Sequence, residues 1–195
     1  MQKPLMTKGR LEAFSDGVIA ILITIMVLEL HAPHGTDWGA LRGLASEFFT
    51  YALSFIFLGI YWNNHHHLLH ATSHVDGAVM WANLHLLFWL SLTPFVTSWM
   101  GGSDFAPLPT AMYGVVLLLS GIAYFILVRM ILRIEGPHSP LAKAIGRDTK
   151  GKISPALYAA AVPIAFISPL VAFSIYVLVA AIWFIPDRRI AAMEH

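Results

Sequence analysis

The sequence contains no cysteine among its 195 residues, and it is poor in charge. Without Cys, the chain can form no disulfide, no thiolate metal site and no cysteine nucleophile. Asp, Glu, Lys and Arg together make up 12% of the residues, whereas an average soluble domain has roughly 25%. Intrinsic disorder and a nucleic-acid-binding domain both require far more charge, so both classes are excluded.

Several functional motifs are also missing. The chain has no TVGYG-like selectivity filter, no phosphate-binding loop, no GxSxG nucleophile elbow and no HExxH zinc motif. Ser15 lies beside Asp16 but has no His near it in sequence, and such a pair is far more typical of a helix cap than of catalysis. The sequence therefore predicts that the protein is not an enzyme and has no cofactor.

Apolar residues dominate what is present. They account for 57% of the chain, and the mean hydropathy is +0.69, which predicts that lipid is the natural solvent. The stretch from Ile153 to Ile185 is too long for one crossing and is interrupted by Pro163 and Pro169, so we expect two helices there. The predicted fold is an all-α membrane protein, a single transmembrane domain over residues 1–195. Its six expected helices cover residues 11–31, 44–66, 78–100, 110–133, 153–167 and 169–186.

The distribution of basic residues agrees with six crossings. An even number places both termini and the loop after the fourth helix on one side of the membrane. Eleven of the twelve Lys and Arg residues then lie on that side, and the exception is Arg42. The positive-inside rule makes this side cytoplasmic. The eleven are Lys3, Lys8, Arg10, Arg129, Arg133, Lys143, Arg147, Lys150, Lys152, Arg188 and Arg189.

One face of the first expected helix has an unusual composition. At about 100° per residue, Gly17, Ile21, Thr24 and Leu28 lie on the same face, with Ile25 at its edge. Asp16 points about 110° away from the centre of this face. Ordinary packing against lipid or a neighbouring helix would explain such a face, and a Thr hydroxyl that bonds to its own helix is equally ordinary.

The end of the second expected helix is rich in histidine. His66, His70 and His74 would lie at i, i+4 and i+8 on one helix face, a spacing that can bind zinc or relay protons. We favour a hydrogen-bonded interfacial end without metal, because no carboxylate cluster or Cys is at hand to complete a metal cage. In the third expected helix, Asn83 is polar inside the membrane and must find a partner, and Pro94 predicts a kink.

Five short motifs follow one another in the first half of the chain. They are Arg10-xxx-Phe14-Ser15-Asp16, Thr24-Ile25-Met26-Val27-Leu28, Tyr61-Trp62-xx-His65-His66, Asn83-Leu84 and Ser91-Leu92-x-Pro94-Phe95. The first is an RxxxFSD element that opens the first helix, and it is the most specific. Together and in this order, the motifs resemble those of the transmembrane-protein-175 family of potassium channels.

This resemblance implies a potassium channel with six helices per repeat. The single-repeat bacterial members are homotetramers in which four copies of the first helix line a pore that has no pore loop. By resemblance, this chain would be a multi-pass protein of a bacterial cell membrane. Its partners would be copies of itself, the lipid bilayer and permeant K+ ions.

The resemblance also implies roles for particular residues. A hydrophobic constriction, acting as the gate, maps onto Ile21, with Thr24 and Leu28 on the following turns and Ile25 as a further contributor to the ion path. A structural polar network would join the first helix to the second and third and hold its orientation. Its expected members are Arg10, Ser15, Asp16, Trp62, His65, His66 and Asn83.

The residues alone leave three functions open. They allow a channel, a proton- or metal-coupled secondary transporter that uses the cluster from His65 to His74, and a membrane scaffold without conductance. The resemblance favours the channel, with moderate selectivity for K+ over Na+, because a hydrophobic ring offers no ligands to replace the hydration water of the ion.

Overall fold

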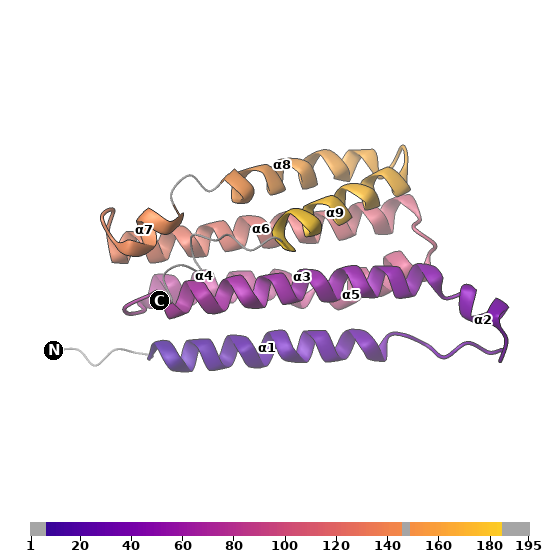
Figure 1. The fold of residues 1–195 in the computed structure, drawn as a ribbon, viewed down its shortest axis with the longest axis horizontal. Coiled ribbons are helices and arrows are strands. Elements are labelled where there is room, and N and C mark those ends of the chain that lie inside the picture. Colours follow the sequence, from indigo (N-terminus) through magenta and orange to yellow (C-terminus); the bar gives the residue numbers. More distant parts are fainter. Residues whose placement is uncertain (1–6, 146–148, 185–195) are drawn as a thin grey trace.

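The computed structural model describes residues 7–145 and 149–184, and helices joined by short loops make up this part of the chain, without a β-strand (Figure 1). The helices are α1 (Lys8–Leu28), α2 (Trp38–Arg42), α3 (Ala45–His70), α4 (Gly77–Ser91), α5 (Thr93–Gly102), α6 (Pro107–Glu135), α7 (Pro140–Ile145), α8 (Thr149–Ile164) and α9 (Pro169–Phe184).

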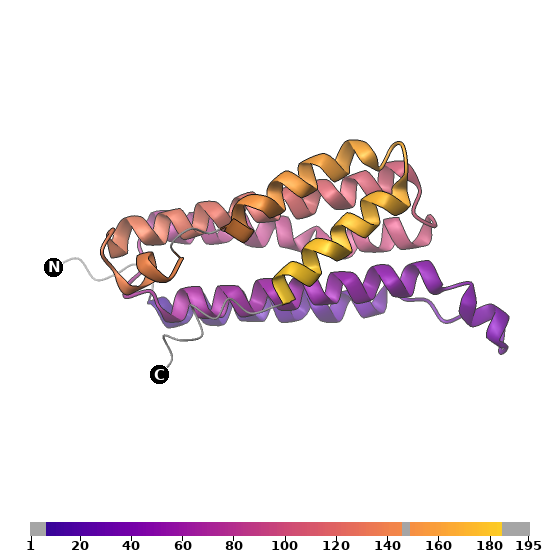
Figure 2. The ribbon, with the colours of Figure 1, turned by 45° about the horizontal axis from the view of Figure 1, so that its top comes forward.

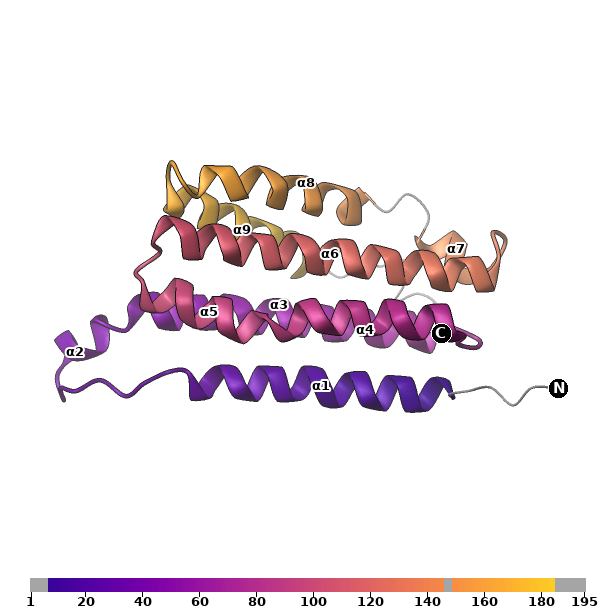
Figure 3. The same cartoon turned by 180° about the vertical axis from the view of Figure 1, so that it is seen from behind.

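The long helices lie roughly side by side and alternate in direction along the chain. Helix α1 forms one edge of the bundle and packs on α3, α4 and α5 (Figures 1 and 3). Helix α6 packs between the α4–α5 segment and α8. Helix α9 crosses obliquely between α8 and α3 (Figure 2). The edge position of α1 leaves one of its sides without a neighbour among the described helices.

Four helical segments in the described part are long and apolar enough to cross a membrane. They are α1, α3, the α4–α5 segment Gly77–Gly102, and α6. Two shorter apolar segments follow, Ile153–Ile164 in α8 and Pro169–Trp183 in α9.

The expected kink near Pro94 takes the form of a break at Leu92. Helix α4 ends at Ser91 and α5 begins at Thr93, so that Pro94 occupies the first turn of the second helix. Proline is tolerated there because a first-turn N–H has no partner within the helix in any case.

Several boundaries differ from those expected. Helix α3 extends four residues past the predicted end at 66. The prediction followed hydropathy, which falls where the apolar stretch ends, whereas the backbone hydrogen bonds of the helix continue to His70. Helix α8 begins at Thr149, where 153 was predicted, and ends at Ile164. The short helices α2 and α7 were not predicted. Residues 185 and 186 of the last predicted helix lie outside the described residues, as do Lys3, Arg147, Arg188 and Arg189.

The core has two parts. One lies among α1, α3, α4 and α6 and includes Ile19 and Leu127. The other lies among α3, α5, α6, α8 and α9 and includes Tyr113 and Tyr176. In the second part, the Tyr176 hydroxyl donates to the Thr110 carbonyl at 3.1 Å and lies directly against Gly114. Any side chain at Gly114 would collide with the Tyr176 ring.

We therefore expect Gly114→Ala to destabilise the protein. Overpacking of a core typically costs about 1–3 kcal/mol, which thermal unfolding of the purified protein in detergent would report as a lower Tm. Gly59→Ala in α3 is the matched control, because a Cβ at Gly59 meets open space within this chain. The control should be neutral or gain up to about 1 kcal/mol from better helix propensity. Equal melting temperatures for the two variants would contradict the close approach of α9 to α6.

Candidate functional site: the outer face of α1 and its supporting network

One side of α1 is built into the core of the chain. Leu11, Ser15, Ile19, Leu22 and Met26 are all buried. Their spacing of three to four residues places them on a single helix face. This face determines which residues of α1 must point away from the bundle.

The opposite side of α1 is exposed. Gly17, Ile21, Thr24 and Leu28 all lie on it, and its centre is about 150° from the centre of the buried face at 100° per residue. The exposed fraction is 57% for Ile21, 39% for Ile25 and 76% for Leu28. Large apolar side chains exposed in a row require lipid or another protein surface against them.

Thr24 supplies a polar atom on this apolar face. Its hydroxyl donates to the Ile21 carbonyl of the preceding turn, with an oxygen–oxygen distance of 2.9 Å. The proton of the hydroxyl is thus committed to the helix backbone, while the oxygen keeps its capacity to accept. A Cβ at Gly17 would meet nothing within 4 Å, so the face is open one turn before Ile21.

A chain of buried hydrogen bonds connects α1 to α4 and α3. The Asn83 amide nitrogen donates to Ser15 Oγ at 2.9 Å, and Ser15 Oγ donates to the Leu11 carbonyl at 2.8 Å. The Asn83 amide oxygen lies 2.7 Å from His65 Nε2. Ser15, His65 and Asn83 are each 0% exposed.

The direction of these hydrogen bonds fixes the tautomer of His65. The amide oxygen of Asn83 can only accept, so His65 Nε2 must carry the proton. The other ring nitrogen, Nδ1, has no hydrogen-bond partner among the described residues. Asn83 is therefore the central member of the hydrogen-bond series. Its amide nitrogen bonds to Ser15 of α1, and its amide oxygen bonds to His65 of α3.

Further contacts surround the buried chain. Trp62 Nε1 donates to Asp16 Oδ1 at 3.1 Å, and Glu12 Oε1 lies 3.2 Å from His66 Nδ1. The Lys8 ammonium donates to the carbonyls of His70 and Thr72 at 2.7 and 2.9 Å. A cation at the C-terminal end of α3 is favourable, because the last carbonyls of a helix have no intrahelical partner.

The contacts of α1 thus involve a somewhat different set of residues from the expected one. The side chain of Arg10 is exposed and makes no hydrogen bond or ion pair within residues 7–145 and 149–184. His66 contacts Glu12, and neither Glu12 nor Lys8 was among the expected members of the network. The position of Glu12, four residues before Asp16 on the same helix face, indicates that it belongs with Asp16 but does not identify its partner on α3.

The three histidines at i, i+4 and i+8 do not all lie on one helix. The rings of His66 and His70 are stacked with centroids 6.0 Å apart. Helix α3 ends at His70, however, and His74 lies beyond it with Nδ1 2.9 Å from Ser73 Oγ. In the part of the chain that the structure describes, no group of three or more His, Asp or Glu side chains is placed to hold a metal ion.

The sequence is similar to known potassium channels. A family model described as the endosomal/lysosomal potassium channel TMEM175 matches residues 10–94, which include every member of the buried hydrogen-bond chain. A potassium channel of Chryseobacterium sp. (strain P1-3) is 54% identical over 185 residues, which cover 95% of this chain and 96% of that protein. A potassium channel of Streptomyces collinus (strain DSM 40733 / Tue 365) is 39% identical over 94 residues, 46% of each chain.

The fold also matches a solved structure. This is the crystal structure of a lysosomal potassium-selective channel TMEM175 homolog from Chamaesiphon minutus, with a TM-score of 0.78. The match covers 92% of this chain and 97% of that one at 24% sequence identity. At 92% of this chain, the similarity of fold extends well beyond the residues that the family model matches.

Replacing Asn83 should reveal how much the buried hydrogen bonds stabilise the packing of α1 on α3 and α4. Asn83→Ala removes both hydrogen bonds and leaves His65 Nε2 as a buried donor without a partner, at a cost of about 1–3 kcal/mol. Trp62→Phe is the comparison variant. It removes only the partly exposed bond to Asp16 and should cost less than about 1 kcal/mol. Thermal unfolding in detergent measures both, and a larger loss for Trp62→Phe would contradict the central position of Asn83.

Proposed function

Because the chain belongs to the TMEM175 family of potassium channels, we propose that it is a potassium-selective ion channel. The family and the curated relatives are ion channels and not enzymes. The observation that carries the proposal is the relative from Chryseobacterium, which is 54% identical over nearly the whole length of both chains and is a potassium channel. Because four of its helical segments are long and apolar enough to cross a membrane, the protein is a multi-pass membrane protein.

The proposed topology has six crossings in one transmembrane domain over residues 1–195. The crossings are α1, α3, the α4–α5 segment, α6, α8 and α9, with both termini in the cytoplasm of a bacterial cell. The supporting observations are the alternating direction of the helices (Figure 1) and the eleven basic residues that this arrangement places on one side. At 16 residues each, α8 and α9 are about 24 Å long, somewhat shorter than the roughly 30 Å of a bilayer core.

The pore is proposed to lie on a fourfold axis between four copies of the chain. Each copy contributes the outer face of α1, with Ile21, Thr24, Ile25 and Leu28 along the ion path. Two facts support this choice of helix. Helix α1 is at the edge of the bundle (Figure 3), and its outer face carries apolar side chains that the other described residues leave exposed.

Ile21 is proposed as the constriction. A ring of four isoleucine side chains offers no ligand to a hydrated cation, so a narrow ring is a barrier that opens when slight widening allows water to enter. Selectivity for K+ over Na+ is expected to be moderate for the same reason. Thr24, one turn away, adds oxygen atoms to an otherwise apolar neck.

The buried hydrogen-bond chain is proposed to have an architectural role. Ser15, His65 and Asn83 lie on the side of α1 that faces the bundle, away from the proposed ion path. Together with the contact between Asp16 and Trp62, they would set the rotation of α1 about its own axis. That rotation decides which residues face the pore.

Ion flux from liposomes that contain the purified protein tests the proposed function. With K+ inside and a dilution-driven gradient, we expect a non-saturating flux that is several times faster than the flux with Na+ inside. Protein-free liposomes give the background. Saturable and pH-dependent flux that is lost when His66 and His70 are replaced would instead support the proton- or metal-coupled transporter. No flux from protein shown to be folded and oligomeric would contradict an open channel.

Ile21→Ala tests the position of the constriction. The smaller side chain widens and wets the apolar ring, so single-channel conductance in planar bilayers should rise severalfold. Val27→Ala is the matched control, because Val27 is also an exposed apolar residue of α1 but lies about 90° from the centre of the proposed pore face. Equal conductance for Ile21→Ala and the unaltered protein would place the constriction elsewhere.

A further inference from the structure

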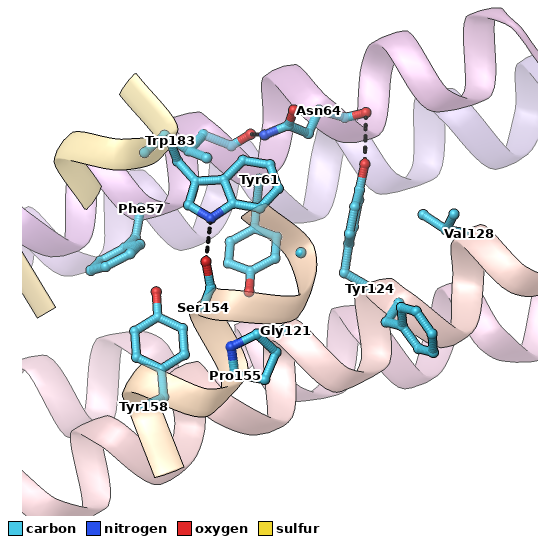
Figure 4. A pocket seen from close by; sticks show the side chains of 13 residues that line it. Phe57, Tyr61, Asn64, Gly121, Tyr124, Val128, Ser154, Pro155, Tyr158 and Trp183 are labelled. Atoms are coloured by element: carbon cyan, nitrogen blue, oxygen red, sulfur yellow. Dashed lines mark hydrogen bonds between the residues drawn. The ribbon is translucent and has the colours of Figure 1, made fainter. Parts of the chain in front are cut away.

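A groove of about 470 Å³ lies between α1 and the α4–α5 segment. It differs in size from the space among α3, α6, α8 and α9, which is about 50 Å³ and has room for little more than water. The walls of that smaller space are held by hydrogen bonds from Trp183 to Ser154 and from Tyr124 to Asn64 (Figure 4). The groove beside α1, in contrast, can receive a large side chain from outside the chain.

The groove is mainly apolar and opens next to the proposed ion path. Leu22, Ile25 and Glu29 of α1 form one wall, and Ile25 is also at the edge of the proposed pore face. The other wall is formed by Ser91, Pro94, Phe95, Ser98 and Trp99. Phe95 is 61% exposed, so its ring requires lipid or another protein surface against it.

Helix α3 carries a stripe of exposed aromatic side chains beside α1. Phe48, Phe55 and Trp62 are seven residues apart, which places them within about 40° of each other on the helix, and all three are exposed. Trp62 donates to Asp16 of α1, so this aromatic stripe (Phe48, Phe55 and Trp62) runs along the flank of α3 that adjoins α1.

The groove and the aromatic stripe lie on opposite flanks of α1. Asp16, which meets the stripe, is about 110° from the centre of the proposed pore face in one direction. Ile25 and Glu29, which line the groove, are about 70° and 110° from this centre in the other direction. The figures agree, since α3 is nearer the viewer in Figure 1 and the α4–α5 segment is nearer in Figure 3.

Phe55 is at the depth of the groove within the bundle. Its neighbour Ser54 has its Oγ atom 2.7 Å from Oγ1 of Thr97, and the residue after Thr97 is Ser98, which lines the groove. Rotation about an axis along the membrane normal leaves the depth of every residue unchanged. A copy of the chain rotated about such an axis therefore presents Phe55 at the level of its neighbour's groove.

We propose that Phe55 of one copy inserts into the groove between α1 and α5 of the next copy around the fourfold axis. This inference rests on the proposed pore, which brings α1 of each copy to the axis and so turns its two flanks toward neighbouring copies. A closed ring of identical chains needs two different surfaces that fit each other. The exposed ring of Phe55 and the apolar groove supply them, and buried aromatic side chains are typical of the centres of such interfaces.

Photocrosslinking of the full-length protein in liposomes tests this contact. Phe55→p-benzoylphenylalanine keeps an aromatic ring in place and reacts on illumination with the C–H bonds that surround it. We expect a covalent dimer on a denaturing gel, and mass spectrometry of the digested dimer should locate the link within residues 22–29 or 91–99. Crosslinks to lipid alone, or dimers linked at other positions, would overturn the proposal.

Two further substitutions serve as controls for the photocrosslinking. Phe166→p-benzoylphenylalanine is the matched control, because Phe166 is also exposed but lies at the turn between α8 and α9, and it should give no dimer. If the Phe55 variant does not assemble, Phe95→p-benzoylphenylalanine decides from the groove side. It should form dimers linked to a peptide that contains Phe55, and their absence would overturn the proposal.

Truncation of the ring tests how much the contact stabilises the assembly. Phe55→Ala should raise the protein concentration at which the oligomer dissociates in detergent by about tenfold or more, as expected for an aromatic side chain at the centre of an interface. Phe166→Ala should leave this concentration unchanged. Light scattering over a dilution series measures both, and equal dissociation of the two variants would overturn the proposal.

The crosslinks and the ion flux fail separately. Flux of K+ from liposomes together with dimers linked outside the groove would leave the channel in place and overturn this interface. The expected crosslinks without any ion flux would support the interface and contradict only the open channel.

Discussion

The amide of Asn83 is the group on which the arrangement of the first helices depends. A polar side chain inside a membrane protein must be satisfied by protein, because lipid offers it no partner. Asn83 meets this requirement by donating to Ser15 and accepting from His65, so three helices must keep one relative position to satisfy one side chain. If α1 packed on its neighbours one residue out of register, its side chains would be rotated by about 100°, and Ser15 would no longer reach Asn83. The same interaction thus fixes both the buried face of α1 and the face that is left outside.

The outer face of α1 could be predicted from the sequence because helical periodicity is a local property. Gly17, Ile21, Thr24 and Leu28 fall on one side of any regular helix, and the structure leaves all four exposed within the chain. The family could be predicted as well, since the RxxxFSD element and the later motifs of the first half are short and ordered, and the comparisons confirm it. The assignment of these residues to an ion path remains a prediction.

Features that depend on packing between distant segments were not predictable in the same way. The sequence does not show that Glu12 meets His66 or that Lys8 reaches the carbonyls at the end of α3, because these pairs are more than fifty residues apart. The small cavity that Gly121 lines among α3, α6, α8 and α9 likewise depends on how α8 packs on α6 and how α9 packs on α3 and α6. The predicted end of α3 was wrong for a different reason: the histidines ended the apolar stretch but not the helix.

The hydroxyl of Thr24 has a consequence for the sign of the ion that the proposed pore admits. Its proton is held by the Ile21 carbonyl, so the group has no hydrogen left to offer an ion and presents only oxygen lone pairs. A ring of four such groups would attract positive charge and offer nothing to an anion. The neck of the proposed pore would in this way discriminate against chloride without any charged residue, through the direction of a single hydrogen bond repeated in each copy of the chain.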